Sequence, residues 1–99
     1  MAQYILMTKL TPEISGDLKK RETIGKEWIK KVDEVCPDVK WVAHYALLGP
    51  YDFMDIYEAD NEESAARVSM ITRANGALSV ETWPAIKWSH YLDIIKECQ

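Results

Sequence analysis

The spacing of apolar residues along the chain alternates between two patterns, and this alternation predicts an order of elements. Short apolar runs rich in β-branched and aromatic residues predict strands over 4–10, 39–48, 51–59 and 77–83. Apolar residues at helical spacing predict one amphipathic helix over much of 13–36 and a second after Asp60. The order is therefore β-α-β-β-α-β, followed by a short C-terminal helix that carries Trp88, Tyr91, Leu92 and Ile95.

Turn-forming residues mark the boundaries of these elements. Gly49-Pro50 separates two strands and predicts a two-residue hairpin loop, because proline cannot donate to a strand ladder. Asp60 is expected to cap the second helix, with Glu63 at the spacing of a capping box. Asn75-Gly76 is expected to close that helix in a left-handed conformation, and Pro84 to end the last strand.

This order of elements predicts an α+β fold of the ferredoxin-like class in a single domain over 1–99. In that plan an antiparallel four-stranded sheet carries both helices on one face and leaves the other face bare. An apolar bare face needs a cover, and a second copy of the chain is the expected one. The sequence therefore predicts a homodimer or a higher oligomer.

The run Leu48-Gly49-Pro50-Tyr51-Asp52, followed by an acidic helix start and by "SVET" at 79–82, resembles the GYD domain family. That family is named for a Gly-x-Tyr-Asp motif, which is Gly49, Tyr51 and Asp52 in this chain. The likeness covers residue 4 to about residue 86 and leaves the tail 87–99 outside. It implies a dimeric α/β barrel in a small bacterial or archaeal protein, and it implies no particular activity.

Strand alternation sorts the hairpin residues into two faces. One face holds His44, Asp55 and their neighbours, and we expect it to line a cavity between two sheets of a dimer. The other is almost wholly apolar, and we expect it to face the helices. The first set is Val42, His44, Ala46, Leu48, Phe53, Asp55 and Tyr57; the second is Trp41, Ala43, Tyr45, Leu47, Asp52, Met54 and Ile56.

His44 and Asp55 are expected to be neighbours across the two strands. A carboxylate beside an imidazole orients the ring, as a general base requires, so the pair is the candidate catalytic group. The alternative is a structural hydrogen bond that satisfies two buried polar groups. The candidate ligand-binding residues are Val42, Tyr51, Phe53 and Tyr57.

The motif itself favours a structural role. An aspartate in a turn accepts hydrogen bonds from nearby backbone N–H groups, and Tyr51 can cover the end of the barrel with its ring. Gly49, Tyr51 and Asp52 are therefore expected to shape the hairpin, with Tyr51 at the mouth of a pocket.

Composition removes several classes of function. The formal net charge of −4 and the single dense basic run Lys19-Lys20-Arg21 argue against nucleic acid. No apolar run reaches the ~20 residues of a membrane span, and the first residues lack the features of a signal peptide. A cytoplasmic protein is expected, with Cys36 and Cys98 reduced. Neighbouring residues offer no metal-ligand spacing, so neither a metal nor a cofactor is expected.

Three functions are compatible with these observations. The first is a binding protein that holds a small, partly apolar molecule in the barrel cavity. The second is a cofactor-independent enzyme, similar to monooxygenases or isomerases of the dimeric barrel class, with His44 as base and Asp55 as its orienter. The third is a structural or assembly protein whose barrel is filled by its own aromatic side chains.

Overall fold

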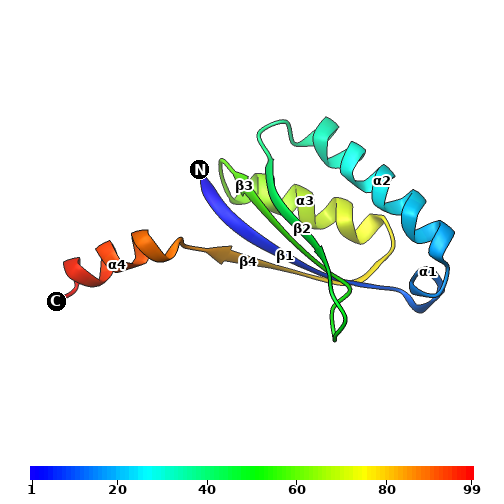
Figure 1. The fold of residues 1–99 in the computed structure, drawn as a ribbon. Coiled ribbons are helices and arrows are strands. Elements are labelled where there is room, and N and C mark those ends of the chain that lie inside the picture. The colour runs from blue at the N-terminus through cyan, green and yellow to red at the C-terminus, as the bar shows by residue number, and fades with distance from the viewer.

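A computed structural model describes residues 1–99 and contains one four-stranded sheet with two long helices on one face (Figure 1). Every strand pair is antiparallel, and the strand order is β2-β3-β1-β4. The α+β ferredoxin-like fold predicted from the sequence is confirmed. The strands are β1 (Ala2–Leu10), β2 (Lys40–Ala46), β3 (Phe53–Ala59) and β4 (Ala77–Ala85).

The first helical segment is divided in two. A single turn, α1 (Pro12–Ser15), precedes the long helix α2 (Leu18–Val35). Asp17 begins α2, because its side-chain Oδ1 accepts a hydrogen bond from the backbone N–H of Lys20 at 3.1 Å. The division places α1 at one end of the sheet and lets α2 run along it.

The second long helix, α3 (Glu62–Ala74), begins one residue later than expected. Asn61 is its cap, and its Oδ1 accepts from the N–H of Ser64 at 3.1 Å. Asp60 lies outside the helix, and its own N–H donates to Asp38. The end of α3 is as predicted, since Gly76 has a φ of 96° and only glycine adopts this conformation without strain.

Pro84 does not end the last strand. Strand β4 continues to Ala85, and Pro84 pairs with Tyr4 of β1. Because β4 lies at the edge of the sheet, its other side has no ladder, and a residue without an N–H is tolerated there.

The hairpin between β2 and β3 has the expected register and a longer loop. His44 pairs with Asp55 and Ala46 with Phe53, as a two-residue loop predicts. Strand β2 nevertheless ends at Ala46 and β3 begins at Phe53, so six residues, 47–52, form the connection, and the N–H of Leu47 donates to the carbonyl of Asp52 at 2.9 Å across its base. The register changes between Trp41 and Ala43, which leaves Val42 as the extra residue of a β-bulge.

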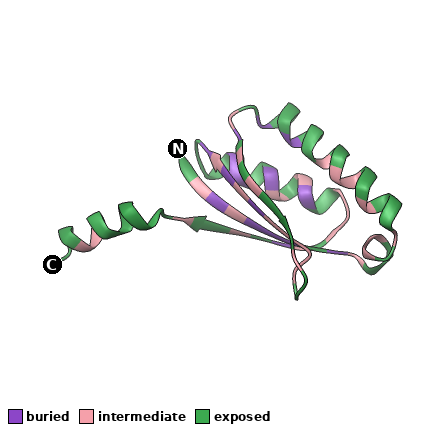
Figure 2. Ribbon diagram, viewed as in Figure 1, coloured by how far each residue is buried: buried purple, intermediate pink, exposed green.

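The core lies between the sheet and helices α2 and α3 (Figure 2). Tyr4 and Leu6 of β1 and Tyr57 of β3 are buried there against both helices. Val32 of α2 and Val68 of α3 have no exposed surface. Since side chains alternate along a strand, these positions identify the helix-covered face of β1 and β3.

The opposite face of the sheet is bare and apolar. By alternation from the core positions it carries Met54 and Ile56 of β3, with Tyr45 and Trp83 on the flanking strands; Tyr45 is 52% exposed and Trp83 42%. The sequence-based assignment of faces is therefore wrong, because His44, Asp55 and Tyr57 lie under the helices. The bare face of the hairpin is the more apolar of the two, so a comparison of polarity pointed to the wrong face as the one that meets the helices.

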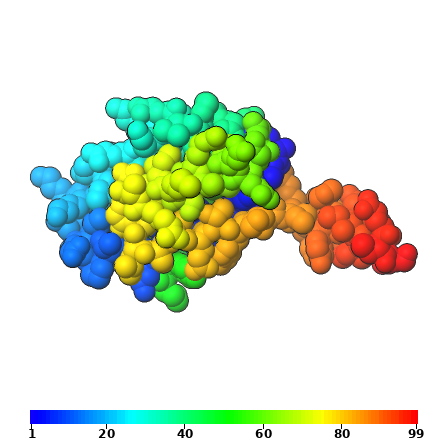
Figure 3. All heavy atoms as spheres, turned by 180° about the vertical axis from the view of Figure 1, so that it is seen from behind, coloured from blue at the N-terminus to red at the C-terminus, as the bar shows by residue number.

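The C-terminal helix α4 (Trp88–Glu97) projects away from the rest of the molecule (Figure 3). Its aromatic residues are exposed, with Trp88 at 68% and Tyr91 at 45%, and their rings stack on each other. With this extension the longest dimension of the chain is 51 Å. None of the helices has both the length and the apolar composition needed to cross a membrane.

Candidate ligand pocket beneath helix α2

A pocket of about 350 Å³ lies between the first half of α2 and the helix-covered face of the sheet. Helix α1 and the end of α3 complete its walls. The pocket is formed within one protomer and does not lie between two sheets. Its apolar lining includes Leu10, Ile14, Ile24, Trp28, Ile29, Phe53 and Ala77, and its polar lining includes Thr8, Arg21, His44, Asp55, Thr72 and Asn75.

Neighbouring strands place the polar residues of the pocket floor. Thr8 of β1 pairs with Phe53 of β3. Two residues further along β3, on the same face, Asp55 pairs with His44 of β2. Thr8 is 3% exposed, and its hydroxyl oxygen has no hydrogen-bond partner in the protein. Buried hydroxyl groups are nearly always paired, so a partner from outside the chain, such as a water or a bound molecule, is expected here.

His44 and Asp55 form the predicted pair. Nδ1 of His44 lies 2.6 Å from Oδ1 of Asp55, a short contact typical of a charge-assisted hydrogen bond. The histidine side chain is 39% exposed and the aspartate side chain 7%. Burial raises the pKa of Asp55 above its ordinary value, and the hydrogen bond from His44 opposes that shift. The predicted contact is confirmed, while its predicted place in a cavity between sheets is wrong.

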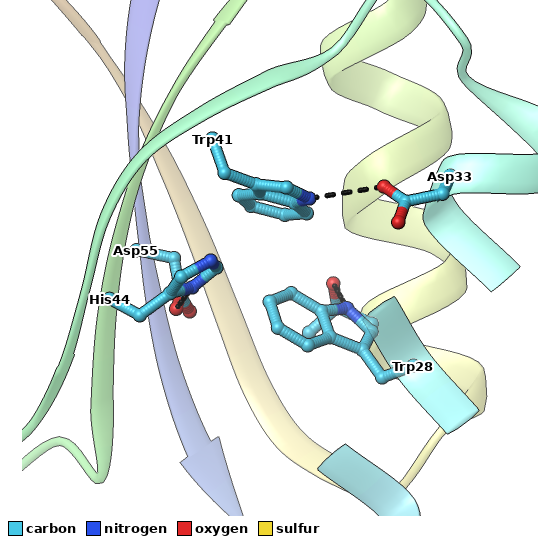
Figure 4. A network of polar contacts seen from close by, with 6 residues as sticks. Trp28, Asp33, Trp41, His44 and Asp55 are labelled. Carbon is cyan, nitrogen blue, oxygen red and sulfur yellow. Dashed lines mark hydrogen bonds and ion pairs between the residues drawn. The ribbon is translucent and has the colours of Figure 1, made fainter. Parts of the chain in front are cut away.

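Two tryptophans enclose the His44 ring (Figure 4). The centroid of the Trp41 ring lies 4.8 Å from the imidazole, and that of Trp28 lies 6.2 Å away, edge on. Each indole N–H is held: Trp28 donates to Thr72 at 2.9 Å and Trp41 to Asp33 at 3.2 Å. The bulge at Val42 turns Trp41 toward the helices. These contacts fix the imidazole against an aromatic wall.

Helix α2 forms the rim of the pocket. The guanidinium carbon of Arg21 lies 5.5 Å from the centroid of the Phe53 ring, within cation–π range. Arg21 forms no ion pair, whereas Lys26 is paired with Glu22 at 3.0 Å. Gly25 also lines the pocket, and a Cβ built on it meets nothing within 4 Å. The missing side chain at this position leaves room for a ligand.

The other predicted ligand-binding residues lie elsewhere, apart from Phe53. Tyr57 has no exposed surface and stacks on Tyr4 in the core, where burial raises the pKa of its phenol. Val42 is the exposed bulge residue and does not line the pocket. Tyr51 donates its hydroxyl to Glu81 of β4, and its ring meets Trp83 edge on. Tyr57 was assigned to the cavity because the assignment of faces was reversed, and Val42 was misplaced because the bulge interrupts the alternation of side chains. Tyr51 lies on the bare side of the sheet, where a cavity between two sheets was expected, and not beside the pocket.

Asp52 performs the structural role expected of the motif. Its N–H donates to the carbonyl of Thr8, and its Oδ2 accepts from the N–H of Leu10, both at 2.8 Å. Gly49 lies at the tip of the loop, in open space. The aspartate therefore ties the beginning of β3 to the end of β1.

Sequence reasoning missed Thr8, Arg21, Gly25 and Trp28. Trp28 and Arg21 follow the spacing of any amphipathic helix, so nothing in the sequence marks them as residues that line a pocket. The one available signal was Gly25, which interrupts α2 where a stronger helix former is expected. A glycine in the middle of a helix indicates that another group packs closely against the backbone there or that the space of a side chain must stay open.

The model of the GYD domain matches residues 4–95. The chain belongs to the GYD domain family. The match extends through most of α4, beyond residue 86, where the resemblance seen in the sequence ended.

A protein from Thermus thermophilus is similar in sequence to this GYD-domain chain over most of its length. It is named glutamine synthetase and cystathionine beta-lyase binding protein, and it is 33% identical over 89 residues, which are 87% of this chain and 90% of the relative.

Solved structures share the fold at low sequence identity. A dimeric ferredoxin-like protein from Thermobifida fusca has a TM-score of 0.54 at 17% identity and covers 85% of this chain and 88% of its own. A protein of Pyrococcus horikoshii has a TM-score of 0.55 at 20% identity and covers 92% of this chain and 96% of its own. At these identities the likeness concerns the fold alone.

Proposed function

We propose that this protein is a binding protein and that the pocket beneath α2 takes a small, partly apolar molecule. The observation that carries the proposal is the pocket itself: about 350 Å³ of space with apolar walls and a few converging polar groups. This size and lining are typical of small-molecule sites. The proposal moves the expected binding site from a cavity between two sheets to the interior of one protomer.

The test uses N-phenyl-1-naphthylamine, a neutral apolar probe whose fluorescence rises when it leaves water. We expect it to bind the parent protein and the Gly25→Ala variant with similar affinity. Gly25→Phe points a ring into the open space at this position and should weaken binding at least tenfold, while circular dichroism shows an unchanged fold. Equal binding by the Phe and Ala variants, or no binding by the parent, would contradict the proposal. Native mass spectrometry of protein purified from its source can then identify a co-purifying molecule.

The alternative proposal is catalysis in the same pocket, with His44 as general base and Asp55 as its orienter. The 2.6 Å contact supports it, because a carboxylate that holds one ring nitrogen fixes the orientation of the ring. For any substrate found, Asp55→Asn should lower kcat steeply with little change in the fold. Unchanged kcat in that variant would leave the pair with a structural role only.

We further propose that the protein assembles with itself through the bare face of the sheet. Support comes from Tyr45 and Trp83, which are exposed on that face, and from the Thermobifida fusca protein of similar fold, which is described as dimeric. Sedimentation should show a species of at least twice 11.4 kDa at micromolar concentration. Tyr45→Asp should dissociate it, whereas Met70→Asp, at an exposed apolar residue of α3, should not. A monomeric parent protein would refute this proposal.

Binding of another protein is a second possible use of the exposed surfaces. The Thermus thermophilus relative is named for binding two enzymes, and α4 of this chain, which projects away from the sheet, exposes the stacked pair Trp88 and Tyr91. Removing residues 87–99 should abolish such an interaction without changing the binding of the naphthylamine probe in the pocket. Loss of probe binding on truncation would contradict the separation of the two surfaces.

A further inference from the structure

Three features of the pocket together indicate the chemical class of its ligand. The ionisable side chains of the lining are those of Arg21, Glu22, Lys26, His44 and Asp55. Glu22 pairs with Lys26, and Asp55 pairs with His44. The guanidinium of Arg21 alone lacks an opposite charge. The pocket therefore carries one uncompensated positive charge.

The position of this charge is fixed by an aromatic ring on the pocket floor. The Arg21 guanidinium lies over Phe53, and Phe53 pairs across the strands with Thr8. Thr8 is buried, and its hydroxyl has no partner. A hydroxyl donor and a guanidinium fork thus flank the same ring, an arrangement that suits a carboxylate because the fork matches two oxygens and the hydroxyl supplies a further hydrogen bond.

We infer that the pocket binds an amphipathic carboxylate, held at its charged end by Arg21 and Thr8. Its apolar body lies against the apolar lining of the pocket, which includes Leu10, Ile14 and Ile24. One free guanidinium matches a single negative charge, which favours a carboxylate over a doubly charged phosphate ester. This inference rests on the proposed binding function and names the class of ligand for that site.

The volume of the pocket limits the size of the ligand. At about 30 Å³ for each water in the liquid, 350 Å³ corresponds to roughly a dozen waters. A chain of about eight carbons with one carboxylate fits within this volume. Octanoate is therefore a suitable probe, with 1-octanol and octylammonium as neutral and cationic analogues of the same length.

The experiment measures how well each analogue displaces N-phenyl-1-naphthylamine at neutral pH. Octanoate should displace it at a concentration at least tenfold lower than 1-octanol does, and octylammonium should be the weakest. Arg21→Gln should reduce octanoate to the level of 1-octanol and leave 1-octanol unchanged. Lys20→Gln, the same change of charge at the exposed neighbouring residue, should preserve the difference.

Thr8→Val provides a second, independent variant. It keeps the shape of the side chain and removes the unpartnered hydroxyl, so the free protein should melt at a higher temperature. Octanoate binding should weaken severalfold in the same variant. A hydroxyl with a merely structural role would change stability without changing the affinity for octanoate.

The outcomes separate this inference from the proposed function. If the probe binds and octanoate displaces it no better than 1-octanol, the carboxylate class is wrong and the binding pocket stands. If Lys20→Gln weakens octanoate as much as Arg21→Gln does, the effect is that of net charge, and the assignment to Arg21 is refuted. If the probe does not bind the parent protein, both proposals fail.

Discussion

Replacing Gly25 with alanine should stabilise the protein. Gly25 is within α2, well away from both ends of an 18-residue helix. A glycine in such a position costs roughly 0.5–1 kcal/mol relative to alanine, because the unfolded glycine has more backbone freedom to lose. A Cβ at this site meets no atom within 4 Å, so no steric cost offsets the gain. For a domain of this length that gain corresponds to a rise in melting temperature of about 2–8 °C.

Urea unfolding followed by circular dichroism measures the change, and calorimetry gives the melting temperature. The slope of the unfolding free energy against urea concentration should be unchanged, since the surface exposed on unfolding is nearly the same. Gly76→Ala is the matched opposite, because its Cβ meets Cδ1 of Ile14 and its φ of 96° disfavours a side chain. It should destabilise the protein by about 1–2 kcal/mol or more. Equal stability of Gly25→Ala and the parent, or a loss, would refute the argument that Gly25 is kept for space and not for folding.

Three further predictions concern the hairpin, the buried carboxylate and the thiols. Asp52→Ala should lower the free energy of unfolding by about 1.5–3 kcal/mol, because the N–H of Leu10 loses a charged acceptor; Asp52→Asn, which keeps an acceptor oxygen, should lose less in the same urea assay. Since burial raises the pKa of Asp55, its contribution to stability is present below the unfolded pKa near 3.8 and is lost as the pH rises through the folded pKa. Unfolding measured across that window should show the parent losing stability relative to Asp55→Asn; parallel pH curves would contradict this. Cys36 is 1% exposed and burial raises the pKa of its thiol, so a thiol reagent should label Cys98 alone in the folded protein and both residues in urea.

The order of elements and the hairpin register could be predicted because local patterns determine them. The apolar periodicity identified the four strands, the two long helices and the C-terminal helix, but not the break between α1 and α2. The position of Gly49-Pro50 set the pairing of His44 with Asp55. Details that depend on tertiary contacts were missed. Asp60 and Asn61 are both good caps, and the contact of Asp60 with Asp38 decides between them. Pro84 stays in its strand because β4 is an edge, which the local sequence does not reveal.

The candidate site was harder to predict than the fold. Alternation placed His44 and Asp55 together correctly, yet it could not tell which face of the sheet the helices cover. The more apolar face of the hairpin is the bare one. An exposed apolar face is typical of a surface that another molecule covers, and the pattern of a single chain does not reveal that cover. Arg21 and Thr8 come from separate elements, and no spacing in the sequence connects them. The packing of α2 on the sheet brings Arg21 over Phe53, which is the cross-strand partner of Thr8.

The Gly-x-Tyr-Asp motif connects the fold to the pocket. Asp52 hydrogen-bonds to the backbone of both Thr8 and Leu10, and the side chains of these two residues line the pocket floor. Tyr51, on the bare side of the sheet, reaches Glu81 of β4. The motif thereby joins the start of β3 to the end of β1 and to the middle of β4, and it holds the strand positions from which the pocket residues project. A motif that touches no ligand can be needed for binding for this reason, because the placement of Thr8 depends on it.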